Sequence, residues 1–174
     1  MTDFYRIAAI TAALAAAPAL AQTTAPMSGD LVGPGNASLG KITVTDAPKG
    51  VILRIEATGL TPGWHGAHFH EKGVCNDEGF KLSGSHIHPG KMGVHGLLNP
   101  KASDYGDLPN IYVAADGTAN VELFSTLVSV SGAGKRPALS DADGSALVIH
   151  ASADDYVTQP IGGAGARVAC AVIK

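Results

Sequence analysis

The sequence predicts an antiparallel all-β domain, built as a sandwich or a barrel. Three observations predict this fold class. In several short segments apolar residues alternate with polar ones, which is the pattern of a strand with one buried face. The chain has 22 glycines and 10 prolines, which favour many turns between short elements. No long segment shows the 3.6-residue period of an amphipathic helix. Short strands joined by many turns are typical of packed or closed antiparallel sheets.

The first 21 residues resemble an export signal and are left out of the fold. They have a short polar start with Arg6, an apolar run over residues 7–17, and the tripeptide Ala-Leu-Ala at residues 19–21. This pattern predicts a secretory signal peptide, cleaved after that tripeptide to leave residues 22–174 as one domain. A membrane anchor is the alternative, but the run is well short of the roughly 20 apolar residues that span a bilayer. No later segment could span a membrane.

Charge and cysteine content narrow the class of protein. The net charge is −3, which argues against nucleic acid as a partner, because such partners call for a basic face. Export implies an oxidising compartment, where disulfides persist. Cys75 and Cys170 are the only cysteines, so a disulfide within the chain has one pairing; two free thiols are the alternative. That bond would close a long loop and stabilise the fold by about 4 to 5 kcal/mol in the chain-entropy model.

The predicted strands follow one another along the mature chain. After a polar linker, "QTTAPMSGD", residues 41–60 hold two alternating runs separated by the turn sequence "DAPKG". The apolar positions of these runs are Ile42, Val44, Val51, Leu53 and Ile55. Residues 110–124, "NIYVAADGTANVELF", repeat the form, with Asp116-Gly117 as a hairpin turn. The apolar runs "SALVIHA" and "ARVACAVIK" at residues 145–151 and 166–174 predict two more strands.

Two stretches do not fit the strand pattern. Residues 72–108 are rich in Gly, Ser, His, Pro and Asp, and residues 151–166 read "ASADDYVTQPIGGAGA". Long loops inside a compact domain are usually functional or disordered. The first stretch holds three of the seven histidines and begins near Cys75, which favours a function.

The histidines are spaced as metal ligands. His68 and His70 stand two apart, so on a strand they point to one side, roughly 7 Å apart at Cα. Alone, such a pair is a weak signal, and a histidine such as His150 at the end of an apolar run is usually a satisfied core residue. Together with further candidates in the long loop they supply enough nitrogen and oxygen donors for one or two metal sites. The loop candidates are His86, His95 and Asp107.

Five collinear segments resemble the copper,zinc superoxide dismutases of the bacterial secreted type. The resemblance runs from about Gly59 to the C-terminus and implies a Greek-key, immunoglobulin-like antiparallel β-sandwich or barrel with long metal-binding and electrostatic loops. The segments are "GWHGAHFHEKGVC", "GSHIHPGKMGVHG", "GDLPN", "VIHASADD" and "GGAGARVACAVIK".

The resemblance also implies metal ligands. His68, His70, His86 and His150 are the expected copper ligands. His86 is expected to bridge copper and zinc, and His95 and Asp107 are further expected zinc ligands. Copper would cycle between Cu(II) and Cu(I), oxidising one superoxide to oxygen and reducing the next to peroxide, with His86 as the proton carrier. Zinc cannot change oxidation state and is expected to hold the loop and tune His86.

Other residues take supporting roles in the same resemblance. Asp154 is expected to link a copper histidine to a zinc histidine, and His65 to tie loop to strand, pointing away from His68 on a continuous strand. Arg167 is the expected cation beside the copper, where a local positive field attracts a small anion to an anionic protein. The two cysteines are expected to form a disulfide that clamps the long loop to the last strand.

The sequence departs from the family at two positions. Asp104 stands where the third zinc histidine is usual, nine residues after His95. Three alternatives follow: Asp104 binds zinc, it is a solvated turn residue beside a three-ligand site, or the zinc site is weak or empty. The second departure is His88, which we expect to face solvent or bond within the loop rather than bind zinc.

The leading function is therefore that of a superoxide dismutase, acting on the superoxide anion in the periplasm or outside the cell, and the export signal favours the periplasm. The alternative is a non-catalytic periplasmic protein that binds or buffers copper on the same fold. A purely structural secreted β-domain would need all seven histidines to be accidental. The sequence leaves monomer and homodimer both open.

Overall fold

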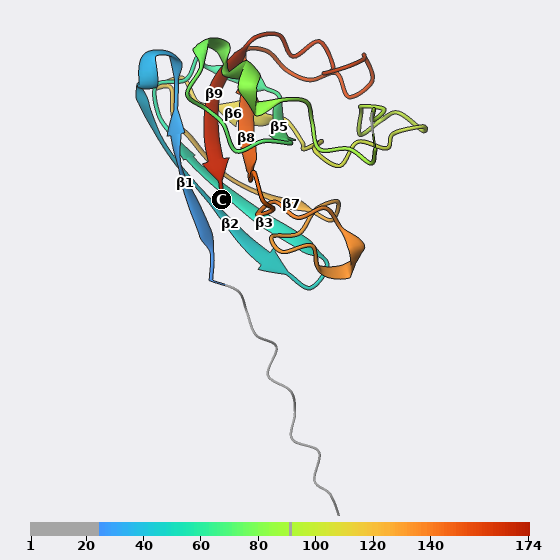
Figure 1. Ribbon diagram of the computed structural model, residues 1–174. Helices are drawn as coiled ribbons and strands as arrows, with labels where there is room; N and C mark the ends of the chain where they lie inside the picture. Colours follow the sequence, from blue (N-terminus) through green and yellow to red (C-terminus); the bar gives the residue numbers. More distant parts are fainter. Residues whose placement is uncertain (1–24, 91) are drawn as a thin grey trace, which may run out of the picture.

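The computed structural model describes residues 25–90 and 92–174 (Figure 1). The expected signal peptide, residues 1–21, lies outside the described residues. The described part is all-β, as predicted, with short 3-10 turns. The strands are β1 (Met27–Val32), β2 (Ser38–Ala47), β3 (Gly50–Ala57), β4 (Gly63–His65), β5 (Ala67–His70), β6 (Ile111–Val113), β7 (Ala119–Ser125), β8 (Ser145–His150) and β9 (Arg167–Ile173). The 3-10 turns are η1 (Pro34–Asn36), η2 (Glu78–Ser83) and η3 (Ala133–Lys135). Within these residues no helix is long and apolar enough to cross a membrane.

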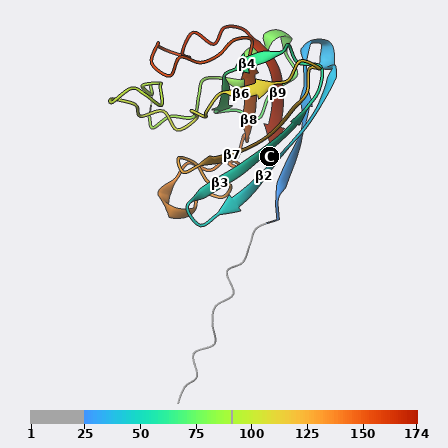
Figure 2. The same cartoon turned by 180° about the vertical axis from the view of Figure 1, so that it is seen from behind.

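Seven strands form one antiparallel sheet that curls around the core. Its order is β5-β8-β9-β1-β2-β3-β7, while β4 and β6 pair separately. Figures 1 and 2 show the long β2 and β3 curving across one side, with the short β4, β5 and β6 at the other end, whereas the loop that contains η3 lies beside the β2–β3 hairpin. The segments that were expected to be loops, residues 72–108 and 151–166, extend from the end with β4, β5 and β6.

The β2–β3 hairpin supplies much of the core, as its alternation predicts. Ile42 lies opposite Ile55, and Val44 lies opposite Leu53. All four side chains are at most 1% exposed. Because one face of each strand is buried, a register slip by one residue would expose this whole set, so the apolar pattern fixes the pairing.

Two expectations about local structure were wrong. The residues from Met27 onward were assigned to a polar linker, but they form β1, which joins β2 to β9. The strand escaped detection because Leu31 is its one fully buried apolar residue, and Gly29 and Asp30 interrupt the alternation. Gly29 is required there, since a Cβ would collide with the carbonyl oxygen of Val172.

The second correction concerns the predicted hairpin around Gly117. The turn exists: the Gly117 amide donates to the Ala114 carbonyl, and Gly117 has the positive φ of +79° that favours glycine. The flanking strands do not pair with each other, however. β6 pairs with β4, and β7 pairs with β3. A turn signal reports a chain reversal, but the partners of the strands are chosen by packing elsewhere in the fold.

A disulfide ties the long loop to the sheet. Cys75 and Cys170 are bonded, with their Cα atoms 5.7 Å apart and their positions separated by 95 in the sequence. Cys170 lies within β9, so the bond holds the start of the 72–108 loop against the last strand. Both cysteines belong to a small buried cluster with Phe80, Ala146 and Val148.

Candidate metal centre

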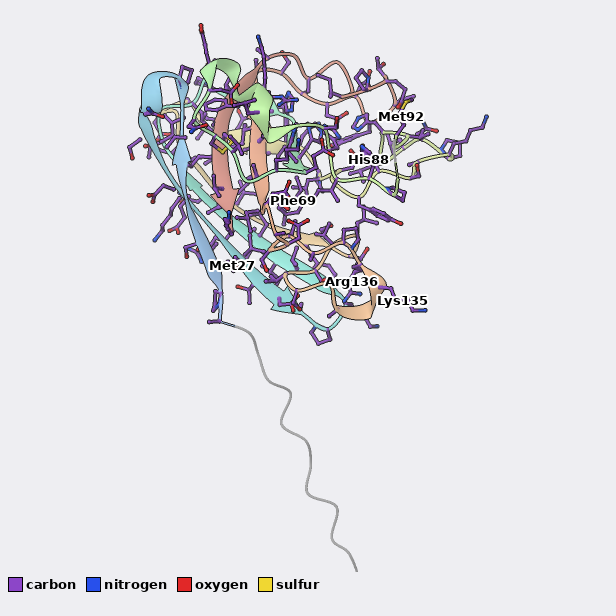
Figure 3. The ribbon with its side chains drawn as sticks, viewed as in Figure 1. Met27, Phe69, His88, Met92, Lys135 and Arg136 are labelled. Atoms are coloured by element: carbon purple, nitrogen blue, oxygen red, sulfur yellow. A yellow bond between two sulfur atoms is a disulfide. The ribbon has the colours of Figure 1, made fainter. Side chains whose placement is uncertain are left out.

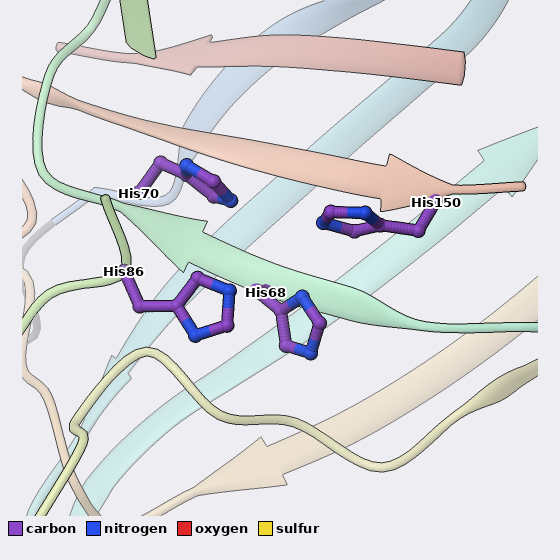
Figure 4. Close-up of side chains that lie close together, drawn as sticks. All are labelled: His68, His70, His86 and His150. Atoms are coloured by element: carbon purple, nitrogen blue, oxygen red, sulfur yellow. The ribbon is translucent and has the colours of Figure 1, made fainter. Parts of the chain in front are cut away.

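Strand pairing brings four histidines to one place. β5 pairs with β8 so that His68 lies opposite Val148 and His70 opposite Ala146. His150 ends β8, and its amide donates to the Gly66 carbonyl at 2.8 Å. On the other edge of β5, the long loop bonds to Phe69 and places His86 opposite His70. Figure 4 shows the four imidazoles turned toward a common space between these segments.

Each of these histidines keeps one ring nitrogen free. The nitrogens His68 Nδ1, His70 Nε2, His86 Nε2 and His150 Nε2 are buried and have no hydrogen-bond partner. The four residues offer ligand atoms that lie within 4.8 Å of one another. An unpartnered buried polar atom is costly, so four that converge indicate a space made for a cation. The donor set fits copper, which imidazole suits well.

The opposite ring nitrogens explain why these atoms are free. His68 Nε2 donates to Asp154 Oδ2 at 2.9 Å, and His70 Nδ1 donates to the Gly84 carbonyl at 2.9 Å. His150 Nδ1 donates to the Gly165 carbonyl at 3.0 Å. Because a neutral imidazole carries one proton, these bonds leave the lone pair on the nitrogen that faces the common space.

Burial keeps the cluster ready for a metal. It lowers the pKa of His68 even though the hydrogen bond to Asp154 raises it, and it lowers the pKa of His70 well below the usual value. Burial, with the nearby His68, lowers the pKa of His150 to about 3. These rings are therefore neutral at pH 7, which is the form that binds metal.

A second group adjoins the first on the other side of His86. It consists of His68, His86, His95 and Asp107, whose ligand atoms also lie within 4.8 Å of one another. His95 Nδ1 lies 2.7 Å from Asp107 Oδ1, and His86 Nδ1 lies 3.2 Å from the same oxygen. All of these residues are at most 4% exposed. Nitrogen and carboxylate donors in a buried group of this kind suit zinc.

Carboxylates change the protonation of this second group. Burial lowers the pKa of His95, but hydrogen bonds to Asp107 and Asp154 outweigh it and raise that pKa to about 10. The same balance, with Asp104 and Asp107 as the partners, raises the pKa of His86. Burial raises the pKa of Asp107, but its hydrogen bonds to His86 and His95 outweigh burial and hold that pKa well below its usual value. In the metal-free protein, protonated His86 and His95 thus supply the positive charge that a metal ion would otherwise bring to these carboxylates.

Asp104 lies beside this group without being a member of it. Its Oδ2 is 3.2 Å from His86 Nδ1, and its Oδ1 accepts the Gly106 amide at 3.0 Å. The residue is only 8% exposed. One of its carboxylate oxygens therefore faces the nitrogen of His86 that points to the second group, while the other braces the loop.

Asp154 joins the two groups. Its Oδ2 accepts from His68 Nε2, and its Oδ1 accepts from His95 Nε2 at 3.1 Å. The Tyr156 amide donates to Oδ1 at 2.6 Å, and the Asn110 side chain bonds to the Asp154 backbone. These bonds fix the carboxylate, which in turn fixes the orientation of both rings.

His65 lies outside both groups and connects backbone segments. Its Nδ1 lies 2.6 Å from the His150 carbonyl, and its Nε2 lies 2.7 Å from the Thr61 carbonyl. It was expected to point away from His68 on one continuous strand. The strand is instead divided at Gly66, since β4 pairs with β6 while β5 pairs with β8.

Arg167 begins β9 and grips the loop around η2. Its Nη1 donates to the Phe80 carbonyl at 2.6 Å and to Ser83 Oγ at 3.0 Å, and its Nη2 donates to the Gly84 carbonyl at 2.8 Å. Burial lowers the pKa of Arg167, but a guanidinium remains charged at neutral pH.

The Gly84 carbonyl positions functional side chains, and the sequence did not predict this role. It accepts from both Arg167 and His70, so one backbone atom positions a cation and a metal-facing ring together. Gly84 has φ +79°, a conformation that favours glycine. A backbone carbonyl leaves no signature in a sequence, although a glycine two residues before His86 was a weak indication.

Comparisons with known proteins agree on one family. A family model described as copper/zinc superoxide dismutase matches residues 38–173. The chain is 65% identical over 135 residues to a superoxide dismutase [Cu-Zn] of Caulobacter vibrioides, covering 78% of each chain. It is 38% identical over 146 residues to superoxide dismutase [Cu-Zn] 1 of Aquifex aeolicus, covering 83% of this chain and 85% of the relative.

Solved structures show the same likeness. A superoxide dismutase-like protein from Bacillus subtilis is 35% identical, with a TM-score of 0.80 over 86% of this chain and 100% of the other. The Cu/Zn superoxide dismutase from Brucella abortus is 27% identical, with a TM-score of 0.67 over 86% of this chain and 100% of the other.

Proposed function

This chain belongs to the copper/zinc superoxide dismutase family, and on that premise we propose which of its residues bind the metals and handle the substrate. The activity is dismutation of superoxide to oxygen and hydrogen peroxide, and the cofactors are copper and zinc. The observation that carries this function is the set of four converging, unpartnered imidazole nitrogens. The copper-buffering alternative is not favoured, because the histidine set is accompanied by Arg167 at the same place.

Copper is proposed to bind His68, His70, His86 and His150. The support is the free nitrogen that each of them turns to the common space. When bound, copper supplies one-electron chemistry, accepting an electron from one superoxide and giving it to another. The residues of the chain hold the neutral rings at fixed tautomers through Asp154, Gly84 and Gly165.

Arg167 is proposed to bind and orient the superoxide anion. Its guanidinium lines the same cavity as His86 and is held in place by three acceptors of the η2 loop. Since the whole chain carries a net charge of −3, a fixed positive group at the cavity is needed to attract an anion locally.

His86 is proposed to deliver a proton to the reduced substrate. Its Nε2 faces the copper group and is unpartnered, while its Nδ1 faces Asp104 and Asp107. Carboxylates on the Nδ1 side raise the pKa of the ring despite its burial, so Nε2 can carry a proton near neutral pH.

Zinc is proposed to bind His86, His95, Asp107 and, as the fourth ligand, Asp104. The support for Asp104 is its low exposure and the approach of its Oδ2 to His86 Nδ1. A carboxylate oxygen is a normal zinc donor, so Asp104 can stand in for imidazole. Asp154 and His65 are proposed to position ligands without touching the metals, Asp154 through His68 and His95 and His65 through the His150 backbone.

Metal content and superoxide removal, measured together, test these assignments. We expect about one copper and one zinc per chain after loading and removal of excess, with fast superoxide removal followed by stopped flow. Copper with little zinc and full activity would overturn the role of Asp104 alone. Stable copper without activity would overturn the enzymatic function and restore the buffering alternative.

Export to the periplasm is proposed for this protein. The support is the signal-like segment at residues 1–21 and the disulfide between Cys75 and Cys170, which an oxidising compartment maintains. Mass spectrometry of the protein from a periplasmic fraction should give a chain that begins at Gln22. A full-length chain retained in the cytoplasm would contradict the proposal.

A homodimer is proposed as the working form. Trp64 and Tyr112 lie side by side on β4 and β6, are 58% and 54% exposed, and pack edge to face with ring centroids 5.1 Å apart. Aromatic residues are enriched at protein interfaces, and in a two-fold dimer the same patch of each copy would form the contact. Sedimentation should give a dimer that Trp64→Ser converts to monomer; a monomeric wild type would contradict it.

A further inference from the structure

The buried metal groups adjoin a cavity at the surface, which we call the entrance. This cavity has a volume of about 330 Å³, and His86, which belongs to both groups, forms part of its wall together with Asp104 and Arg167. The histidines that face copper are at most 4% exposed, so an incoming ion must pass a wall of this kind. The other lining residues include two with side chains that can bind a soft metal ion and that belong to neither metal group, His88 and Met92.

His88 offers a free nitrogen at this entrance. Its Nδ1 is buried and has no hydrogen-bond partner, which is the property shared by the four nitrogens that face copper. Gly93 allows the residue to sit close to Asp104: a Cβ on Gly93 would lie 2.7 Å from His88 Cβ and 3.5 Å from Asp104 Cβ. His88 is thus packed against the loop next to the zinc group, with a donor atom that nothing in the described residues engages.

Met92 offers a sulfur atom at the same entrance. It is 85% exposed, the highest value among the exposed large apolar side chains of residues 25–90 and 92–174. Packing in a hydrophobic core therefore does not explain why a methionine stands at this position. An unbranched thioether has three rotatable bonds and can turn toward a neighbouring donor. Figure 3 shows Met92 and His88 together on the outer loop, far from Met27 on β1.

We propose that His88 and Met92 form a capture site for Cu(I), from which copper passes by way of His86 to the buried histidines. The proposal rests on the proposed copper binding by those histidines. Imidazole with thioether is a soft donor pair that favours Cu(I), whereas the carboxylates of the second group favour zinc. These two donors therefore select Cu(I) over zinc at the surface, before either metal reaches the buried centre. No change of oxidation state is needed for capture.

Silver(I), a redox-inert substitute for Cu(I), tests the site on protein already loaded with copper and zinc. We expect calorimetry to show about one Ag(I) bound per chain, with affinity reduced about tenfold or more in His88→Gln and in Met92→Leu. Met27→Leu is the matched control, because this methionine lies at the start of β1, and it should bind Ag(I) as the wild type does.

The rate of copper loading tests the route. Metal-free protein is mixed anaerobically with Cu(I) bicinchoninate, and the loss of the coloured complex is followed. We expect loading to slow about tenfold in either variant, with the same final copper content and an unchanged rate in Met27→Leu. Unchanged Ag(I) binding and unchanged loading in both variants would overturn the proposal. Ag(I) binding in a copper-loaded protein that leaves superoxide intact would overturn the proposed function and leave the capture site standing.

Discussion

At the scale of the residue, the ability of this centre to bind a metal depends on which nitrogen of each imidazole carries the proton. Asp154 and two backbone carbonyls, those of Gly84 and Gly165, take the proton side of His68, His70 and His150. The remaining lone pairs converge because the other side of each ring has a fixed acceptor. The chemistry of the centre thus depends on groups that do not touch the metal.

Arg167 is the residue whose removal should weaken substrate capture most directly. In Arg167→Ser we expect the second-order rate of superoxide removal to fall about tenfold or more and to depend less on salt, because the local positive charge is lost. Stopped-flow measurements at several ionic strengths check this. Arg54→Ser, an exposed change on β3, is the control and should leave the rate near that of the wild type.

Removal of the Asp104 carboxylate should weaken the binding of zinc. Because its carboxylate oxygen approaches His86 Nδ1, Asp104→Ala should weaken zinc binding by about tenfold or more while copper still binds. Competition with a zinc chelator measures this. Asp141→Ala removes an exposed carboxylate instead and should change nothing. Equal zinc affinity in both variants would show that Asp104 braces the loop without binding zinc.

At the scale of the element, the long loop between β5 and β6 is held at three places. The disulfide joins it to β9, Arg167 grips the carbonyls around η2, and the bonds between Phe69 and the loop at Ile87 and Gly106 cover the edge of β5. These contacts hold the loop in place of the regular backbone hydrogen bonds that join strands within a sheet. They also place His86 and Asp107 alongside β5.

Loss of the disulfide should therefore cost stability and loosen the centre. In a Cys75→Ser/Cys170→Ser double variant we expect the free energy of unfolding to fall by about 2 to 5 kcal/mol, because the unfolded chain regains the freedom of the loop. Urea unfolding of metal-free protein measures it. Wild-type protein under reducing conditions should match the double variant; a difference between them would mean that the serines add an effect of their own.

At the scale of the whole molecule, the two metal groups differ in charge and therefore in how they respond to pH. Burial lowers the pKa values of His68, His70 and His150, whereas hydrogen bonds to carboxylates outweigh burial and raise those of His86 and His95. Before metal binds, the first three imidazoles are therefore neutral, and the last two are protonated and positively charged. The fold achieves this because His68, His70 and His150 come from β5 and β8 of the sheet, whereas most of the aspartates beside His86 and His95 come from the long loop between β5 and β6.

Zinc binding should consequently release protons. At pH 7 His95 is protonated in the metal-free protein, since its pKa is about 10, and zinc must displace that proton. The apparent zinc affinity should rise with pH until about pH 10, whereas His70 and His150, already neutral, should release none to copper. Calorimetry in buffers of different ionisation enthalpy counts the protons. Zinc uptake without proton release would contradict this account.

The same titration should affect the stability of the metal-free protein. The pKa of His95 is higher in the folded protein than its ordinary value near 6.5. Its stabilising effect is therefore complete below pH 6.5 and is lost as the pH rises toward 10. The melting temperature of metal-free wild type should fall over that range, and His95→Gln should remove much of the slope.

The sequence by itself determined the fold class, the family resemblance and the residues that the structure brings together in the two groups of possible metal donors. It could do so because strand alternation is a local property, and because donor residues such as His68 and His70 keep fixed spacings. It did not determine β1, the strand division at Gly66, the separate partners of β6 and β7, or the role of the Gly84 carbonyl. Those depend on segments far apart in the chain, and on backbone atoms that every residue shares. Only the tertiary structure decides which free nitrogens meet, and it places His88 and Met92 together at the entrance to them.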